Sequence, residues 1–405
     1  MRTVARPFTT TTPFADALRM ALDDAAPIGR AETVGLSDAD GRVLAEDIRA
    51  GADVPPFDRA AMDGYAVRAA DTAAARPEAP ATLRRTGVVF TGQAPDRVVG
   101  SGDCVQIATG APIPEGADAV VMVERTRAEG EAVHVLEAAR EGQHIGRRGA
   151  DMRAGDVVVR AGQTIDPARA GAIAAIGVDS ARVYARPTVA LVSTGNEIVD
   201  AGRPLGPWQI YGINRVTLAS IVRRHGGVPV VMPLAADTIE ALDAALTAAL
   251  AHDVVVFSGG SSVGERDLLR DVVEPRGKIR FHGIAVKPGK PTMFASVGGT
   301  PVFGMPGNPT SCLSNGYLLL APFLRRVARL SAWEPQRVSV PLARAIRSAS
   351  DRHQFYTVRV TDGAAEPAFK GSGEITSMAH ADGYVEIPPG TAELEAGMVV
   401  TVTLF

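Results

Sequence analysis

The sequence has few cysteines and lysines, no excess of positive charge and no long apolar run. Its two cysteines, Cys104 and Cys312, exclude a disulfide framework and a cysteine-rich zinc site. With 42 basic and 45 acidic residues the formal net charge is −3, so nothing indicates a nucleic-acid-binding surface. The longest strongly apolar stretch near a helix, residues 317–324, is far shorter than the ~20 residues that span a bilayer.

Several common functional motifs are also missing. The sequence has no G-x-x-x-x-G-K-[ST] motif, no complete dinucleotide-binding fingerprint and no nucleophile elbow. Its seven histidines are scattered without the spacing of metal ligands, so a Ser/His hydrolase and a His-based metalloenzyme are poorly supported. Arg2 and Arg6 precede a Thr-rich polar segment instead of an apolar signal core, so we expect a soluble, cytoplasmic protein.

The length and the composition predict a globular protein of several domains. A chain of 405 residues with 46% hydrophobic and 21% charged residues corresponds to two to four domains. Between residues 53 and 124, short β-type runs separated by Gly/Pro turns predict a small β-rich domain. A helix is predicted over residues 14–25, and another is predicted from Pro167, with Asp166 as its N-cap and Gly177 at its end.

Strands and helices alternate in the second half of the chain. Apolar runs predict strands at residues 189–192, 228–232, 254–257 and 302–303, and helices at 213–225, 238–251, 265–273 and 309–330. This alternation predicts βαβ crossovers and a parallel sheet with helices on both faces. After Trp333, alternating segments at 356–360, 384–387 and 398–404 predict a small β-barrel or sandwich.

Three of the predicted strands end in glycine-rich turns that carry Ser, Thr or Asn, at residues 193–197, 258–264 and 304–309. Ligands bind beyond the carboxyl ends of parallel strands, and glycine lets the backbone approach them closely. We therefore expect one crevice for a phosphate or another oxyanion. Asn308 before Pro309 also predicts an N-cap for the helix that follows.

Lysine is rare, and its placement is therefore informative. Lys287 and Lys290 are two of only four lysines in a chain with 38 arginines, and they lie in a turn that contains Pro288 and Pro291. A lysine ammonium binds oxyanions as a compact point charge. A solvated turn is the alternative, but the nearby glycine-rich loops favour anion binding.

Three acidic residues are candidates for the same crevice. Glu197 follows a glycine turn, where it could bind magnesium or simply favour a helix start. Asp267 could equally interact with the first turn of its own helix. Asp237 is followed by Glu240, which predicts a capping box for a helix that starts at Thr238.

Six sequence strings together resemble the molybdopterin molybdenumtransferase (MoeA) family, whose eukaryotic relatives include the E domain of gephyrin. They are FDRAAMDGYAV at 57–67, TGAPIPEGADAVVMVE at 109–124, STGNE at 193–197, SGGSSVGERD at 258–267, VKPGKP at 286–291 and GMPGNP at 304–309. They follow the family's order and cover most of the chain. The α/β region alone would also fit the related molybdopterin adenylyltransferases.

The resemblance implies a four-part subunit. Residues 1–52 and 141–178 would form an elongated linking domain, with a β-rich domain inserted at 53–140. Residues 179–330 would form the α/β molybdopterin-binding domain, and residues 331–405 a C-terminal β-barrel. The family forms homodimers whose active crevice lies between the α/β domain of one chain and the β-domain of the other.

The resemblance also implies the reaction and the residues that perform it. The family inserts molybdate into adenylylated molybdopterin and releases AMP, assisted by Mg²⁺. The residues that match the family's catalytic positions are Asp58, Thr109, Glu197, Asp237 and Asp267, with Glu197 and Asp267 as metal ligands. The residues that match its substrate-binding positions are Thr194, Gly195, Ser258, Gly259, Gly260, Ser262, Gly264, Lys287, Lys290, Pro291, Pro306, Gly307, Asn308, Pro309 and Ser372.

Some positions depart from the family pattern, and other functions stay open. Thr357 stands where the family often has an arginine that could contact molybdate, although Arg359 is close in sequence. Molybdate and tungstate have nearly the same size and charge, so these residues fit both. The alternative functions are adenylylation of molybdopterin and a non-catalytic pterin- or partner-binding scaffold of the gephyrin type. Possible partners are a molybdopterin adenylyltransferase and proteins that mature molybdoenzymes.

Overall fold

The structure is a computed structural model that describes residues 11–259, 267–348 and 351–405. The chain divides into two compact units, each described here by itself. The first unit comprises Met1–Glu32, Gly41–Val43 and Tyr184–Phe405, and the second comprises Thr33–Asp40 and Leu44–Val183. Within the described ranges, no helix is long and apolar enough to cross a membrane.

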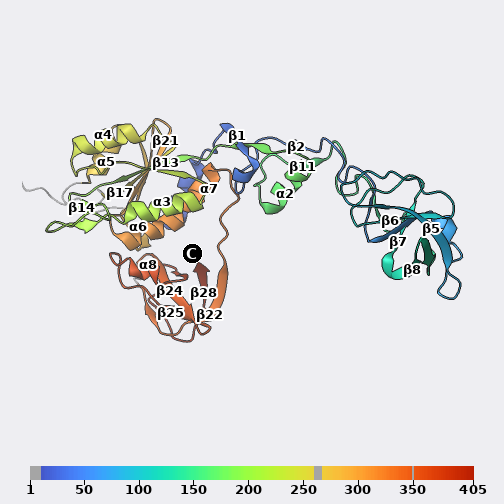
Figure 1. Cartoon of the computed structure of the whole chain (residues 1–405). Helices are drawn as coiled ribbons and strands as arrows, with labels where there is room; N and C mark the ends of the chain where they lie inside the picture. Colours follow the sequence, from blue (N-terminus) through green and yellow to red (C-terminus); the bar gives the residue numbers. More distant parts are fainter. Residues whose placement is uncertain (1–10, 260–266, 349–350) are drawn as a thin grey trace, which may run out of the picture. The chain divides into compact units, whose positions relative to one another are not determined.

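A six-stranded sheet forms the centre of the first unit (Figure 1). Its order is β16 (Val228–Val231), β13 (Thr188–Ser193), β17 (Val254–Ser258), β21 (Thr300–Met305), β20 (Met293–Val297) and β18 (Gly277–His282). The first four strands are parallel, as predicted. The last two strands were not predicted, and β20 runs antiparallel to both of its neighbours, β21 and β18, so the sheet is mixed and not purely parallel. Gly298 and Gly299, with φ of 58° and 90°, form the two-residue turn that makes a hairpin of β20 and β21.

Helices cover both faces of this sheet (Figure 1). Leu191 packs with residues of α1 (Phe14–Asp23), α3 (Asn214–Arg224) and α7 (Ala321–Val327), whereas its neighbour Val192 packs with α4 (Ile239–Ala249) and α5 (Leu268–Val273). This alternation is what a strand buried on both faces requires. The single helix predicted over 309–330 is instead α6 (Pro309–Asn315), a π-helical turn η4 (Gly316–Leu320) and α7.

The tail of the first unit forms a second sheet, in the order β19-β24-β26-β28-β22, with β25 beside β24. These strands are β19 (Val286–Lys287), β24 (His353–Thr361), β26 (Gly383–Ile387), β28 (Val399–Leu404), β22 (Arg337–Pro341) and β25 (Ala364–Pro367). A bridge between Leu342 and Ala365 joins its two ends, the pairing that a small barrel requires. The tail also contains α8 (Thr376–Ala379) and the strand pair β23 (Ile346–Arg347) with β27 (Glu393–Leu394). Another short pair, β14 (Ile198–Val199) with β15 (Ile210–Tyr211), lies between β13 and α3 along the chain.

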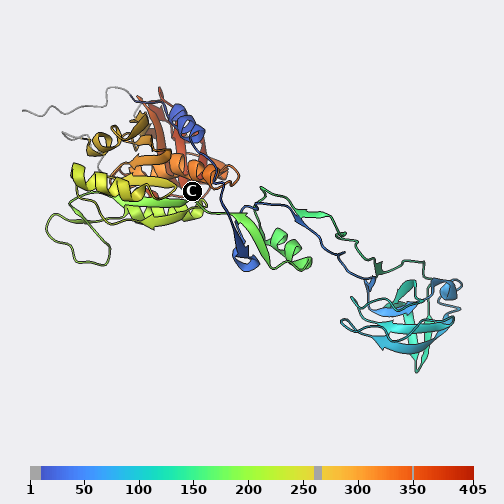
Figure 2. The same cartoon turned by 90° about the horizontal axis from the view of Figure 1, so that it is seen from above.

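The second unit contains the predicted β-rich region as one six-stranded sheet (Figure 2). Its order is β7 (Ala119–Met122), β4 (Gly64–Val67), β6 (Asp103–Ile107), β5 (Ala81–Val89), β9 (Ala132–Val135) and β8 (Thr126–Glu129). Only β5 and β6 are parallel.

Chain segments on either side of that sheet also pair with one another. The pairs are β1 (Ala31–Gly35) with β12 (Ser180–Tyr184), β2 (Ile48–Arg49) with β11 (Val157–Val159), and β3 (Arg59–Ala60) with β10 (Ile145–Gly146). The helix α2 (Pro167–Ala175) begins where predicted, because Asp166 Oδ1 accepts a hydrogen bond from the Arg169 N–H at 2.8 Å. The limits of the four domains remain predictions.

Candidate functional site

A cavity of about 1120 Å³ opens at the carboxyl ends of β13, β17 and β21. Every described residue of the substrate-binding set lines it, including Thr194, Ser258 and Asn308. Gly260, Ser262 and Gly264 lie outside the described residues. The cavity is large enough for a nucleotide-sized ligand.

Glycine is needed where two of these loops meet. Gly195 has a φ of 142°, and a Cβ there would lie 2.7 Å from Ile198 Cγ1. Gly259 has a φ of 94°, and a Cβ there would lie 2.6 Å from the carbonyl oxygen of Thr194. The Thr194 N–H donates to the carbonyl of Ser258 at 3.0 Å, so the two loops form one continuous wall. The backbone is thereby left accessible to a ligand.

Polar atoms on this wall are left unsatisfied. Thr194 Oγ1, Asn214 Oδ1 and Asp237 Oδ1 are buried and accept or donate no hydrogen bond among the described residues, and all three residues line the cavity. A buried polar atom without a partner costs about 1–3 kcal/mol. Such atoms are uncommon in folded proteins, and their concentration here indicates a ligand site.

Asp237 does not have the capping role that its sequence predicts. The N-cap of α4 is Thr238, with φ of −131° and ψ of 152°, and its hydroxyl accepts a hydrogen bond from the Ala241 N–H at 3.2 Å. Both residues can cap a helix, but the chain turns into the helix one residue later than a cap at Asp237 would need. Asp237 is therefore left on the cavity wall.

The two predicted metal ligands have different surroundings. Glu197 is exposed on the cavity lining. Asp267 caps α5, where Oδ1 accepts from the Arg270 N–H at 3.2 Å, and its Oδ2 lies 2.6 Å from Nε2 of His282. The predicted contact with its own helix is confirmed. His282 was missed because it lies on β18, a strand that the sequence pattern did not predict.

No set of three or more His, Cys, Asp or Glu side chains among the described residues could hold a metal ion. The carboxylates that line the cavity are Glu197 and Asp237. Mg²⁺ is commonly bound by one or two carboxylates, several waters and the phosphates of a substrate. The residues fit that mode, in which the substrate supplies part of the coordination, and do not form an all-protein metal cage.

The turn with Lys287 and Lys290 lines the cavity, and the buried side chain of Asn315 fixes its backbone. Gly289 has a φ of 110° and leaves no room for a Cβ, which would lie 2.4 Å from Nδ2 of Asn315. That buried amide donates to the Gly289 carbonyl at 2.9 Å and to Thr292 Oγ1 at 2.6 Å. The turn is therefore fixed by the core beneath it.

The C-terminal region adds two cations that no sequence motif indicated. Arg352 and Lys370 line the same cavity as the turn lysines. They are more than sixty residues from the turn along the chain, and no local pattern marks them. The pairing of β19 with β24, in which Lys287 lies opposite Gln354, brings that part of the tail to the site.

Ser372 also lines the cavity and is hydrogen-bonded to the N-terminal end of α6. Asn308 Nδ2 donates to Ser372 Oγ at 3.2 Å, and the Thr310 N–H donates to the Ser372 carbonyl at 3.1 Å. Asn308 is the N-cap of α6 by position, but its side chain makes no capping hydrogen bond. Thr357 is buried in β24 and does not belong to this lining.

Asp58 and Thr109 belong to the second unit. Hydrogen bonds there keep the carboxylates of Asp58 and of Asp63, which contacts Thr109, ionised. Asp58 accepts from the Arg148 N–H at 2.8 Å and from Arg147 Nη1 at 2.7 Å. These hydrogen bonds, chiefly the backbone one, lower the pKa of Asp58. Thr109 donates through its N–H at 2.7 Å and its hydroxyl at 3.0 Å to Asp63, which lowers the pKa of that carboxyl.

Three family models match the chain in succession. The MoeA N-terminal region (domain I and II) matches residues 12–177, the probable molybdopterin binding domain matches residues 190–326, and the MoeA C-terminal region (domain IV) matches residues 339–405. Together they span both compact units and include the cavity.

Relatives and solved structures match over nearly the whole length. Molybdopterin molybdenumtransferase 2 of Mycobacterium tuberculosis is 35% identical over 91% of this chain and 94% of its own. Molybdopterin molybdenumtransferase of Haemophilus influenzae is 33% identical over 92% of this chain and 94% of its own. A crystal structure of the MoeA protein from Pyrococcus horikoshii, 38% identical, superposes with a TM-score of 0.84 over 98% of this chain and 99% of its own. On the sequence strings, the fold and these matches, the chain belongs to the molybdopterin molybdenumtransferase (MoeA) family.

Proposed function

We propose that this chain inserts molybdate into adenylylated molybdopterin and releases AMP and the finished molybdenum cofactor. The observation that carries the proposal is one cavity lined both by glycine-rich loops and by four cationic side chains. A phosphate-bearing pterin and a tetrahedral dianion require these two kinds of surface together. The names of the relatives agree with this activity.

The cavity residues suggest how the reaction is performed. Lys287 and Lys290 bind molybdate and replace part of its hydration, while the backbone around Gly195 and Gly259 receives phosphate oxygens. Asp237 has an unpartnered Oδ1 that can accept a proton or orient a water at the phosphoanhydride that must be cleaved.

We propose that Mg²⁺ assists the reaction, with Glu197 as a ligand on the cavity wall and Asp267 as the second. Asp267 does not line the cavity, and its two oxygens contact the Arg270 N–H and His282 Nε2, so it would have to exchange the His282 contact to hold the ion. When bound, the ion supplies positive charge that offsets the phosphates. Isothermal titration of Mg²⁺ in the presence of AMP, with Glu197→Gln as the variant, tests this assignment without turnover.

We also propose that two chains form a homodimer in which Asp58 and Thr109 of one copy complete the cavity of the other. Two observations support this. Asp58 is held ionised by Arg147 and Arg148 yet remains on the surface, and its neighbours Phe57 and Met62 expose 44% and 43% of their area. Exposed apolar side chains beside a fixed carboxylate are typical of an interface.

Hybrid dimers test the shared site. A chain with Asp58→Ala and a chain with Glu197→Ala should each be inactive, and a mixture should regain part of the activity because one intact site forms per hybrid. Absence of recovery in dimers shown to have exchanged subunits would count against a site shared between copies.

A reconstitution assay separates the three candidate functions. Supplied with adenylylated molybdopterin, molybdate and Mg²⁺, the chain should release AMP and generate cofactor that activates an apo-molybdoenzyme. An adenylyltransferase would instead consume ATP and molybdopterin and release pyrophosphate. A scaffold would bind the pterin and produce neither product.

The proposed function also comes with domain limits, a cellular location and partners that we propose for the chain. Residues 1–52 and 141–178 form the linking domain, 53–140 the inserted domain, 179–330 the α/β domain and 331–405 the barrel. A cytoplasmic location agrees with two cysteines that are both free and buried. An adenylyltransferase that delivers the substrate and a maturation protein that accepts the product are the expected partners.

A further inference from the structure

Three of the four lysines of this chain line the same cavity. They are Lys287 and Lys290 of the turn and Lys370 of the C-terminal region, whereas Lys278 lies on β18 outside the lining. We infer that Lys370 is a third oxyanion-binding lysine, contributed by the tail, and that it sets the affinity for molybdate. The inference rests on the proposed function and adds a residue to its site.

The backbone around Lys370 is fixed. Its N–H donates to Ser377 Oγ at 2.9 Å, and that hydroxyl belongs to a fully buried side chain. Its Nζ donates to Thr376 Oγ1 at 3.1 Å, which orients the ammonium. An ammonium has three N–H donors, so two remain for a ligand. A side chain that is already oriented loses less conformational entropy when it binds.

The loop that carries Lys370 is attached to the wall of the cavity. Thr310 Oγ1 in α6 donates to the Glu374 carbonyl at 2.7 Å, and Asn308 Nδ2 donates to Ser372 Oγ at 3.2 Å. These hydrogen bonds bracket the segment that follows Lys370. The ammonium is therefore held at the cavity by contacts to the α/β part and does not depend on the tail alone.

Lys370 forms no ion pair among the described residues, although the Glu374 carboxylate lies beside Gly371 in the same loop. Arg352, another cation of the lining, instead forms an ion pair with Asp351 at 2.5 Å. A cation without an ion-pair partner beside two further lysines raises the local positive potential. A tetrahedral dianion offsets that charge, and a compact ammonium suits it better than a planar guanidinium.

Direct binding of molybdate to the full-length chain tests the inference. Equilibrium dialysis should compare the unmodified chain with Lys370→Gln, Lys287→Gln and Lys278→Gln at two salt concentrations. We expect Lys370→Gln to raise the Kd for molybdate roughly threefold to tenfold and to flatten its salt dependence, because one screened charge is lost. Lys278→Gln, which removes the same charge outside the cavity, should leave the Kd unchanged. Lys370→Arg should recover part of the affinity.

The outcomes distinguish the inference from the proposed function. If Lys287→Gln weakens molybdate binding and Lys370→Gln does not, the inference is wrong and the proposed function stands. If Lys370→Gln weakens the binding of AMP and leaves molybdate unaffected, Lys370 contacts the phosphate of the pterin substrate and its assignment to molybdate is overturned. If the unmodified chain does not bind molybdate, both the inference about Lys370 and the proposed function are wrong.

Discussion

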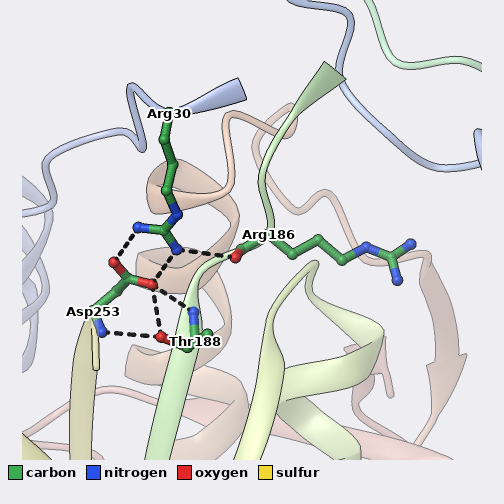
Figure 3. Close-up of polar contacts among 4 residues, drawn as sticks. All are labelled: Arg30, Arg186, Thr188 and Asp253. Atoms are coloured by element: carbon green, nitrogen blue, oxygen red, sulfur yellow. Dashed lines mark hydrogen bonds and ion pairs between the residues drawn. The ribbon is translucent and has the colours of Figure 1, made fainter. Parts of the chain in front are cut away.

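Strands β13 and β17 have polar groups at both ends, and the two ends differ in how those groups are satisfied. At the amino ends, Asp253 accepts hydrogen bonds from both terminal nitrogens of Arg30 at 2.6 Å, from the Thr188 N–H at 2.6 Å and from the Thr188 hydroxyl at 2.8 Å (Figure 3). At the carboxyl ends, Thr194 Oγ1 and Asp237 Oδ1 are buried without a partner among the described residues.

We call the amino ends of β13 and β17, where Asp253 is fully hydrogen-bonded, the structural edge of the sheet. We call their carboxyl ends, where Thr194 and Asp237 lie, the functional edge. Burial alone would raise the pKa of Asp253, but the hydrogen bonds from Arg30 and Thr188 lower it overall, so the carboxylate stays ionised and stabilises the fold. At the opposite edge, polar atoms without a partner among the described residues lie on the cavity lining, where a ligand could satisfy them. Proteins retain unsatisfied polar atoms of this kind where function requires them.

The largest expected effect is at the functional edge. Asp237→Asn should lower AMP release by about 100-fold or more, as for loss of a group that transfers a proton. The free energy of unfolding should change by less than about 0.5 kcal/mol, because no hydrogen bond of that carboxylate is lost. Glu240→Gln, in the first turn of α4, is the matched control and should behave as the unmodified chain. Full activity of Asp237→Asn would remove Asp237 from the mechanism.

At the structural edge, an Asp→Asn substitution should instead lower stability and leave turnover nearly unchanged. Asp253→Asn should lower the free energy of unfolding by about 1–2 kcal/mol, because the carboxylate loses its charge-assisted hydrogen bonds from Thr188 and from the half-exposed Arg30. Turnover at saturating substrate should stay within about twofold. Arg186→Gln is the control, since Arg186 contributes only its carbonyl and its side chain points away from the network (Figure 3). Urea denaturation measures both, and equal stability of the two variants would contradict the comparison.

Another buried group of the first unit, His225 at the C-terminal end of α3, should make stability depend on pH. Burial, with Arg325 and Arg224 nearby, lowers the pKa of His225 to about 4. The unfolded chain binds a proton near pH 6.5, so stability is complete above that value and falls as the pH drops toward 4. We expect a loss of about 2 kcal/mol between pH 7.5 and 5.

His225→Phe separates this effect from other titrating groups. The substitution keeps an aromatic ring against Trp333, whose centroid lies 5.2 Å from that of His225, and removes the proton-binding site. Denaturation of this variant at several pH values should show a smaller decline than the unmodified chain. An identical decline would mean that His225 does not titrate in this range.

The smallest expected effects concern two helix N-caps near the functional edge, Thr238 and Asn308. Thr238→Ala should cost about 1 kcal/mol, because Thr238 caps α4. Asn308→Ala should cost less, about 0.5 kcal/mol in the free energy of unfolding, because the Asn308 side chain makes no cap and loses only its exposed hydrogen bond to Ser372 Oγ. Denaturant midpoints measure both, and a larger cost at Asn308 would assign it a structural role that its hydrogen bonds do not indicate.

Local patterns predicted much of this molecule. The helix α2 begins at the predicted cap, and the four parallel strands lie where apolar runs placed them, because buried strands and helix starts depend on residues close in sequence. The strands β18 and β20 were missed. They are similar in length to the predicted strands, and β18 even alternates polar and apolar residues from Lys278 to His282. The position of β20 depends on the Gly298-Gly299 turn that folds it back onto β21.

The sequence by itself determined the order of strands and helices, the glycine-rich turns at the strand ends and the lysine turn, because periodicity and glycine's backbone freedom are local properties. Only the tertiary structure decided that Lys370 and Arg352 reach the same cavity, and that Asp267 meets His282. It also decided that Thr238 caps the helix and leaves Asp237 on the cavity wall. These outcomes depend on which distant strands become neighbours and on where the chain turns into a helix, and packing across the whole unit sets both.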